Sequence, residues 1–341
     1  MKKTLQSFLC LLSLVSFSFI ISSCSLSSGL SGNSSDAPEL TGDGKSIHVL
    51  TIGTADSGGT MYPVGSAIAQ AISDHDANIK VNTSASNGSF TNVEALRAGQ
   101  IDLALVSGDV AFCAYNGTEE FAENPSKDLR IIAAVYSSLS NWIAASDSNL
   151  IYVHDLKNKN IAVGPKDSTT ELSARIALKA VGLDETNTHQ INYGLGSGGI
   201  EVERGNLDAL HGFAGIPING LSQLANSVPC RILKYTDDEL KEILAENQYY
   251  YPASIPAGTY KGQLTAVQTF GVKCLVCVSA DMSDELVYNL TKILDESRPW
   301  FIENYETMAS MEMMSFVCQD LPIPLHPGAR QYYEEAGYLK K

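Results

Sequence analysis

Basic residues are scarce in this sequence. Its 341 residues include 23 Lys and Arg against 38 Asp and Glu, which gives a formal net charge of -15 at pH 7. Domains that bind nucleic acid carry clustered basic residues, so this composition argues against a nucleic-acid partner. Because net charge does not determine the charge of a single pocket, the class of any small ligand stays open.

Motifs of common catalytic sites are missing as well. The sequence holds no GxSxG nucleophile elbow, no HExxH zinc signature and no P-loop. One GxGxxG pattern runs from Gly194 to Gly199, but Asn219 stands about 20 residues later, where a dinucleotide-binding fold needs an acid. We interpret this run as a flexible linker between a short strand and a helix near Ile200. The sequence therefore predicts no catalytic residue, no cofactor and no metal site, and we expect the chain not to be an enzyme.

The histidines do not cluster. We expect each to lie at the surface or to be hydrogen-bonded in the core: His48, His75, His154, His189, His211 and His326. Asp102 and Asp208 could be imagined as paired carboxylates, but each begins a predicted strand and is expected to cap a turn.

A disulfide framework is not indicated. Besides Cys10 and Cys24, the cysteines are odd in number and irregular in spacing: Cys113, Cys230, Cys274, Cys277 and Cys318. Cys274 and Cys277 form a CxxC inside an apolar run, where a strand would place them on opposite faces. We expect buried thiols rather than a redox or metal pair.

The N-terminus has the layout of a signal peptide. Lys2 and Lys3 precede an apolar run from Leu9 to Ile21, which is shorter than the about 20 residues of a membrane span. The run ends in Ile21-Ser22-Ser23-Cys24 and resembles a bacterial lipobox. Acyl chains on Cys24 would contribute about 0.8 kcal/mol per buried methylene to membrane binding. We predict a lipoprotein signal peptide at 1–23 and an exported protein anchored through Cys24. The alternatives are a plain secretory peptide cleaved nearby and a retained membrane helix.

The segment after Cys24 has few large apolar residues. Serine, glycine, aspartate and proline dominate it, so it cannot bury enough surface to offset its chain entropy. We predict a flexible tether at 24–46. The remaining chain, from Ile47 to Lys341, is long enough for two domains or lobes in the periplasm or extracytoplasmic space.

The body of the chain alternates apolar runs with amphipathic segments. This alternation is typical of βαβ units on a largely parallel sheet, and it predicts an α/β fold. The expected strands are Ile47–Ile52, Ile79–Thr83, Ile101–Val106, Arg130–Val135, Asn160–Val163, Leu207–Phe213, Cys230–Leu233 and Val267–Val278.

One local pattern occurs twice. The run from Val93 to Leu105 and the run from Ile200 to Leu210 both read as a helix, a glycine, a polar residue and a strand with an early aspartate. Glycine just past a helix end supplies the left-handed C-cap conformation. The repeat predicts two similar α/β lobes, although such junctions also recur in unrelated α/β proteins.

Three polar loops lead from a strand into a helix. The first is glycine-rich and runs from Thr54 to Pro63, the second is Ser86 to Ser89, and the third is Asp167 to Glu171. Helix N-termini offer free N–H groups and suit a carboxylate or phosphate, although each loop can also be a tight turn or a cap of its own helix. Because they follow the carboxyl ends of strands, we expect them to converge on a crevice between the lobes.

Several ordered motifs resemble the TAXI family of TRAP transporter receptors. They are Leu50 to Pro63, Asn87 to Asn92, Gly99-x-Ile-Asp102, Ser107 to Ala111, Ala114 to Gly117, Asp155 to Lys159, Val163-Gly164, Gly205-x-Leu-Asp208, Gly215-x-Pro217 and Ile255 to Tyr260. The resemblance covers about Ile47 to Leu294. It implies a two-lobed type II periplasmic-binding fold with a ligand cleft between the lobes. We therefore expect one lobe to comprise 47–135 and 265–341 and the other 136–264.

The resemblance also implies a function. Members capture a small organic acid or amino acid such as glutamate and deliver it to a sodium-coupled membrane permease. Carried over by position, the ligand site comprises Thr54, Ser57, Gly58, Gly59, Thr60, Tyr62, Asn87, Gly88, Ser89, Asn92, Ser107, Asp109, Tyr136, Ser168, Thr169, Thr170, Gly215 and Pro217. The sequence departs from the family pattern at Asp56 and Asp167, two acids that disfavour an anion unless they point away or pair with Lys166. Two other functions stay open: a lipoprotein sensor of a small solute, and an enzyme acting on a small carboxylate in the same cleft.

Overall fold

The computed structural model describes residues 39–40, 46–246 and 248–340. The predicted signal peptide and Cys24 lie outside the described residues. Strand β1 (Glu39–Leu40) pairs antiparallel with β2 (Ser46–Gly53), so three residues of the predicted tether, Glu39, Leu40 and Ser46, belong to the sheet. None of the helices in the described ranges has the length and apolar character needed to cross a membrane.

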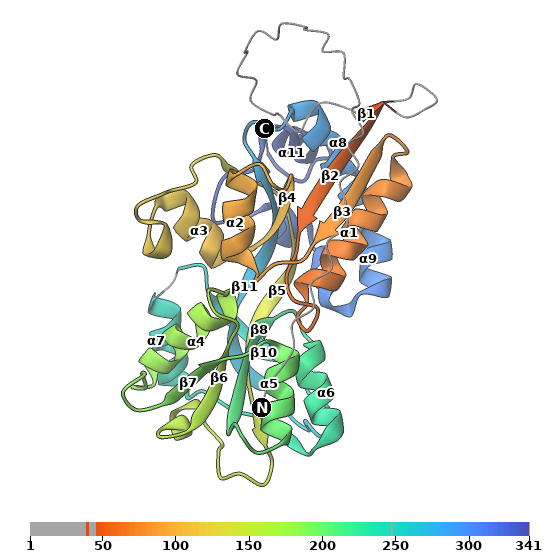
Figure 1. Ribbon diagram of the computed structural model, residues 1–341. Coiled ribbons are helices and arrows are strands. Elements are labelled where there is room, and N and C mark those ends of the chain that lie inside the picture. Colours follow the sequence, from red (N-terminus) through yellow and green to blue (C-terminus); the bar gives the residue numbers. More distant parts are fainter. Residues whose placement is uncertain (1–38, 41–45, 247, 341) are drawn as a thin grey trace, which may run out of the picture. The chain divides into compact units, whose positions relative to one another are not determined.

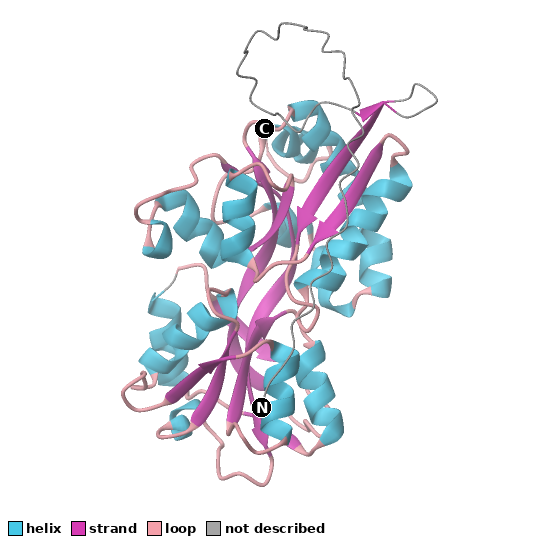
Figure 2. Cartoon of the chain, viewed as in Figure 1, coloured by secondary structure: helices cyan, strands magenta, loops and turns pink. Residues whose placement is uncertain are grey.

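Strands and helices alternate over most of the chain (Figure 2). The further strands are β3 (Ile79–Ser84), β4 (Leu103–Ser107), β5 (Leu129–Ala145), β6 (Asn160–Gly164), β7 (His189–Asn192), β8 (Ala209–Ala214), β9 (Cys230–Ile232), β10 (Tyr251–Ile255) and β11 (Val267–Ser279). The α-helices are α1 (Met61–His75), α2 (Ser89–Arg97), α3 (Gly108–Asn116), α4 (Thr169–Ala180), α5 (Leu195–Glu203), α6 (Asn219–Ser227), α7 (Asp237–Glu246), α8 (Asp284–Glu296), α9 (Arg298–Asn304), α10 (Met314–Cys318) and α11 (Pro327–Glu335). The described residues also form the 3-10 helices η1 (Glu119–Phe121), η2 (Val153–Leu156) and η3 (Glu306–Glu312).

Two long strands join the two lobes. The main path of the sheet runs β1-β2-β4-β11-β5-β8-β6-β7, with β11 and β5 antiparallel at its centre. Strand β5 has 17 residues and spans about 55 Å at ~3.3 Å per residue, and β11 has 13 residues. Both pass from one lobe into the other (Figure 1). The pairing of β5 with β11 shifts register on either side of Leu275 and Val276, and such bulges bend and twist a strand.

Each lobe has its own buried core. In the first lobe, side chains such as Leu50, Leu105 and Leu290 pack around β2, β4 and the adjoining ends of β5 and β11. In the second lobe, neighbouring residues Trp142 and Ile143 of β5 belong to two different clusters. Successive strand residues point to opposite faces, so helices cover both faces of this sheet, with α4 and α7 on one and α5 and α6 on the other (Figure 1). The predicted two-lobed α/β fold is confirmed, while the residue boundaries of the lobes stay a prediction.

The expected strands exist, but several boundaries differ. Strand β5 continues to Ala145 instead of ending at Val135, because its burial persists through the second lobe. Strand β10 was not among the expected strands, and β7 is the short strand expected before Gly194. The interpretation of Gly194 to Gly199 as a flexible linker is wrong, since five of its six residues form the first part of helix α5.

The repeated local pattern has the same geometry in both lobes. The Asp102 carboxylate accepts the Thr51 N–H at 2.7 Å, and the Asp208 carboxylate accepts the Asn160 N–H at 2.9 Å. In return, the N–H groups of Asp102 and Asp208 donate to the carbonyls of Thr51 and Asn160 at 2.9 and 2.7 Å. The glycines that end the two helices have φ of 66° and 75°. The aspartates thus fasten each strand to its parallel neighbour, which corrects the expectation that they cap turns.

Candidate functional site

A small cavity lies where residues of the two lobes meet. Its volume is about 60 Å³. Its wall consists of Ala55, Asp56, Gly59, Thr60, Met61, Asn87, Gly88, Tyr136, Pro165, Ser168, Thr169, Thr170, Leu195, Phe213 and Ala214. Since a cavity needs about 10–15 Å³ to hold one water molecule, this space admits only a small solute in the conformation described.

Four helices begin at the wall of this cavity. Thr60 and Met61 start α1, Gly88 precedes α2, Ser168 to Thr170 start α4, and Leu195 starts α5. The first N–H groups of a helix have no acceptor within it, and the helix dipole makes this end positive. The three predicted helix starts therefore lie together, and α5 adds a fourth.

The loop between β2 and α1 is folded around Asp56. The Asp56 carboxylate accepts a hydrogen bond from the Gly58 N–H at 3.0 Å. The backbone carbonyl of Asp56 accepts one from the Gly59 N–H at 3.1 Å. A β-carbon at Gly194 would lie 3.2 Å from Asp56 Oδ2, so the carboxylate lies beside the residue that precedes α5. Asp56 belongs to the first lobe and α5 to the second, which places this charge at their boundary.

Two side-chain hydrogen bonds join the lobes beside the cavity. Thr60 Oγ1 donates to the Gly215 carbonyl at 2.6 Å, and Thr169 Oγ1 donates to Ser89 Oγ at 2.9 Å. Ser89 Oγ also accepts the Ser107 N–H at 3.0 Å. These contacts bring the lobes together, as expected of a closed binding protein.

Gly215 leaves no room for a side chain at the lobe boundary. A β-carbon there would lie 2.8 Å from Thr60 Cγ2 and 2.9 Å from Tyr136 Cδ2. Distances below 3.0 Å require a neighbour to shift. The absence of a side chain at this position thus permits the close approach of Thr60 to the segment after β8.

A second contact between the lobes lies on the side of α3. Tyr250 OH donates to Asp109 Oδ2 at 2.9 Å, and the rings of Phe112 and Tyr249 lie 4.4 Å apart. Burial raises the pKa of the Asp109 carboxyl, although hydrogen bonds from Tyr250 OH and the Val110 N–H oppose that rise. Asp109 therefore bonds to the opposite lobe and is not part of the cavity wall.

Other predicted ligand residues fasten the strand ends. Thr54 Oγ1 donates to the Ser84 carbonyl at 3.0 Å. The Asn92 amide donates to the carbonyls of Thr54 and Leu105, both at 2.8 Å. Asn92 is fully enclosed, so its side chain links β2, α2 and β4 behind the cavity.

His211 is buried and forms a hydrogen bond with the first turn of α4. Its Nδ1 lies 3.1 Å from the Thr170 carbonyl, which can only accept, so Nδ1 carries the proton. Nε2 then accepts from Ser140 Oγ at 3.0 Å, and Ser140 accepts from Tyr235 OH at 2.9 Å. Burial lowers the pKa of His211 to about 3, which keeps the ring neutral. The direction of every hydrogen bond in this chain is thereby fixed.

The predicted site residues fall into two groups. Those in the cavity wall are Gly59, Thr60, Asn87, Gly88, Tyr136, Ser168, Thr169 and Thr170. Those outside the wall are Thr54, Ser57, Gly58, Tyr62, Ser89, Asn92, Ser107, Asp109, Gly215 and Pro217. Wall residues that the sequence did not single out as ligand contacts are Ala55, Asp56, Met61, Pro165, Leu195, Phe213 and Ala214. Phe213 and Ala214 end a strand just before Gly215, so the same strand-end rule could have found them.

The cysteines of the described ranges are buried and free. Burial raises the pKa of Cys274 to about 12, and it also raises that of Cys277. The prediction that this CxxC consists of buried thiols is confirmed. Within the part of the chain that the structure describes, no three His, Cys, Asp or Glu side chains are grouped to hold a metal ion.

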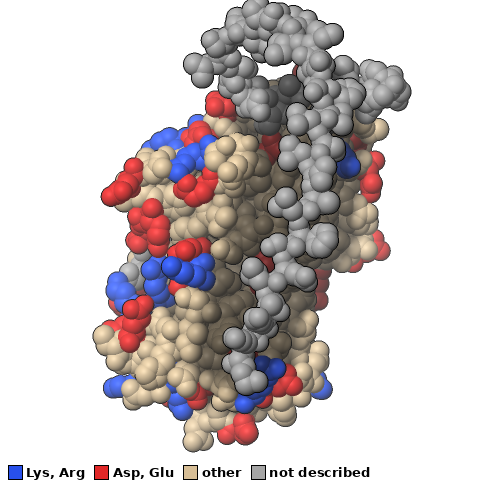
Figure 3. Space-filling model, viewed as in Figure 1, with Lys and Arg blue, Asp and Glu red and all other residues tan. Residues whose placement is uncertain are grey.

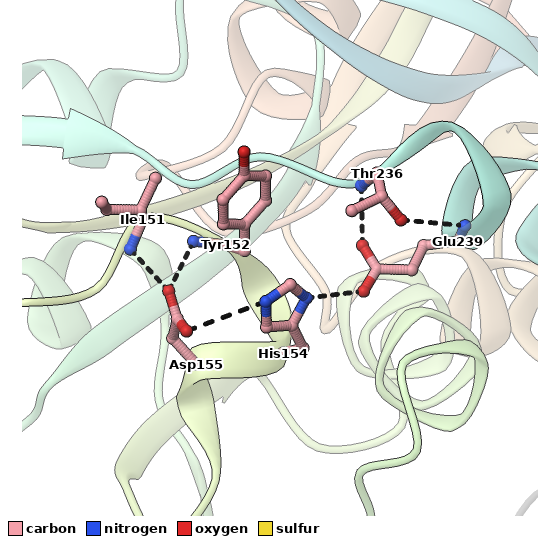
Figure 4. Close-up of polar contacts among 6 residues, drawn as sticks. All are labelled: Ile151, Tyr152, His154, Asp155, Thr236 and Glu239. Atoms are coloured by element: carbon pink, nitrogen blue, oxygen red, sulfur yellow. Dashed lines mark hydrogen bonds and ion pairs between the residues drawn. The ribbon is translucent and has the colours of Figure 1, made fainter.

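The histidines are dispersed, and none of the described residues in the cavity wall is a histidine. His154 lies on the surface of the second lobe, where its Nδ1 contacts Glu239 Oε1 at 2.7 Å and its Nε2 lies 3.8 Å from Asp155 (Figure 4). His326 accepts the Gly328 N–H and so caps α11. His48 is half-buried, and its Nδ1 has no hydrogen-bond partner among the described residues.

Charges of both signs are mixed on the face shown in Figure 3. Acidic and basic side chains lie next to one another along the outer edges of both lobes there. The excess of acidic residues thus does not form one continuous field on this face.

The fold and the cavity define an α/β protein of the two-lobed periplasmic-binding type. Residues 52–337 match the NMT1-like family, and the chain belongs to this family.

Several solved structures are similar to this chain, and the first of those below supports the fold. A protein from Bordetella bronchiseptica RB50 is similar with a TM-score of 0.52 and 14% identity, over 85% of this chain and 82% of that chain. The periplasmic aliphatic sulphonate-binding protein SsuA from Escherichia coli has a TM-score of 0.48 and 16% identity, over 84% of this chain and 78% of that chain. An ancestral arginine-binding protein bound to arginine has a TM-score of 0.48 and 15% identity, over 76% of this chain and 97% of that chain. At these identities the likeness concerns the fold alone.

Proposed function

We propose that this chain is the extracytoplasmic solute-binding receptor of a TRAP-type transporter, anchored in a membrane through Cys24. It captures a small organic acid or amino acid, the class to which glutamate belongs, and delivers it to membrane permease subunits. One observation carries the proposal: four helix starts, two from each lobe, surround one small cavity. The TAXI-like motifs support the choice of transporter type.

Closure explains how such a receptor signals that it is loaded. A solute held by both lobes favours the closed form only by its differential affinity for that form. A shift from 1:99 to 99:1 requires about 5.5 kcal/mol. The proposed hinge lies in β5 and β11, the two strands that pass between the lobes, with the lobes divided at 47–135 plus 265–341 and 136–264.

The proposed ligand contacts are the predicted residues of the cavity wall and the helix starts beside them. The first N–H groups of α1, α2, α4 and α5 would hold a carboxylate, and the hydroxyl groups of Ser168, Thr169 and Thr170 would complete the polar side. The solute leaves chemically unchanged, so this function needs no catalytic group.

Mass spectrometry of the solute that co-purifies with the full chain tests this function. The same solute should raise the melting temperature with increasing concentration, since ligand at 100 times Kd stabilises by about 2.7 kcal/mol. Conversion of the solute by the purified protein would contradict capture and favour an enzyme. A stabilising solute without any uptake defect in cells that lack the protein would instead favour a sensor.

A further inference from the structure

The charged groups around the cavity are unevenly distributed. None of the described residues in its wall is Lys, Arg or His, and Asp56 is the one acid among them. Burial raises the pKa of Tyr136 well above its ordinary value, so this phenol stays neutral. Asp56 and Asp167 are both exposed, but Asp167, the other acid that departs from the family pattern, lies outside the wall. The two aspartates are thus not equivalent.

The wall has three chemically distinct parts. The helix starts present N–H donors from both lobes. Asp56 presents a carboxylate at the boundary of the lobes, with Oδ1 bonded to the Gly58 N–H and Oδ2 free of any hydrogen bond to the described residues. Met61, Leu195 and Phe213 present apolar surface.

A solute that matches these parts carries a carboxylate, an ammonium group and a small uncharged remainder. The carboxylate suits the helix starts, and the ammonium suits Asp56. A second carboxylate would find no basic side chain in the described wall and would be repelled by Asp56.

We infer that Asp56 determines specificity by selecting solutes with an ammonium group next to one carboxylate over hydroxy acids and dicarboxylates. This inference rests on the proposed function and narrows its solute class to small uncharged amino acids.

Calorimetric titration of the full chain with three matched probes tests the inference. L-2-aminobutyrate carries the ammonium group, L-2-hydroxybutyrate replaces it with a hydroxyl group, and succinate carries a second carboxylate. We expect wild-type protein to bind the amino acid at least about tenfold more tightly than either other probe, as one charge-assisted hydrogen bond allows. In Asp56→Asn, this preference should fall to about threefold or less.

Asp167→Asn is the matched control. It makes the same change of charge in another loop that precedes a helix, and asparagine tolerates the φ of 57° at this position. Its preference for the amino acid should equal that of the wild type.

The outcomes separate the two claims. Equal or tighter binding of hydroxybutyrate or succinate by the wild type would overturn the role of Asp56 and leave capture standing. An unchanged preference for the amino acid in Asp56→Asn would also overturn the role of Asp56 in specificity. Asp56 would then only stabilise its own loop and contact the start of α5. If neither these probes nor a co-purified solute bind, the proposed function fails and the inference fails with it.

Discussion

Thr169 and Ser89 begin two helices in opposite lobes, and Thr169 Oγ1 donates a hydrogen bond to Ser89 Oγ over 2.9 Å. Ser89 Oγ also accepts the N–H of Ser107 at the end of β4. The same oxygen therefore takes part in the structure of the first lobe and in its contact with the second.

Thr169→Val should weaken solute binding. Valine keeps the shape of threonine but cannot donate, so the closed form loses a bond worth about 0.5–1.5 kcal/mol, or roughly two- to twelvefold in Kd. Titration with the co-purified solute measures this loss. Thr291→Val removes a buried threonine bond within α8 and serves as the control, for which Kd should not change. Equal losses in both variants would mean that the bond across the lobes has no special role.

Gly215→Ala should hinder closure. Its β-carbon would lie 2.8 Å from Thr60 Cγ2, across the lobe boundary, so the clash falls mainly on the closed form. We expect solute affinity to fall by at least about tenfold, because a cost of 1.4 kcal/mol on closure has that effect. Gly196→Ala is the control, since a β-carbon there meets nothing within 4 Å. Small-angle scattering with saturating solute should show a more open form for Gly215→Ala alone.

Tyr250→Phe should destabilise the fold by about 1–3 kcal/mol. The change leaves Oδ2 of the buried Asp109 carboxyl without its phenol donor, while Oδ1 keeps the Val110 N–H, and an unsatisfied buried oxygen has a cost of this size. Urea unfolding measures the effect as a lower midpoint with an unchanged slope. Tyr288→Phe removes an exposed phenol bond to Glu335 and should have a much smaller effect. Comparable midpoints for the two variants would contradict this account of Asp109.

His211 should make stability depend on pH. Burial holds its pKa at about 3 in the folded state, below the unfolded value of about 6.5. Between these values the unfolded chain binds a proton that the folded chain does not, so stability rises with pH in this window and falls as the pH is lowered. His211→Asn keeps a donor for the Thr170 carbonyl but cannot titrate. The advantage of wild type over the variant in free energy of unfolding should shrink by about 2 kcal/mol between pH 7 and pH 5. A constant difference would show that His211 titrates normally.

Local patterns predicted much of this fold. The alternation of apolar runs and amphipathic segments indicated the α/β class, and the repeat around Asp102 and Asp208 indicated two similar lobes. Both signals are local, because strand and helix periodicity arise from the backbone itself. The three polar loops also lie together, as the strand-end rule predicts.

Contacts between distant segments were beyond such reasoning. Nothing in the sequence near Asp109 specifies Tyr250, which lies 141 positions later, as the partner of its carboxyl. The glycines of Gly194 to Gly199 suggested flexibility, but packing overrides their low helix propensity and makes them the start of α5. The extent of β5 was missed because its burial continues into a second core that only the complete fold creates.

The passage of β11 from one lobe to the other also orders the assembly of the chain during its synthesis. Residues Leu275 to Cys277 lie between β4 and β5 at the centre of the first lobe's sheet. The ribosome releases them only after the whole of the second lobe's α4 to α7 region has been made. The sheet of the lobe that begins first in the chain can therefore be completed only after the second lobe's segments have been made, because β4 and β5 lack their shared partner strand until then.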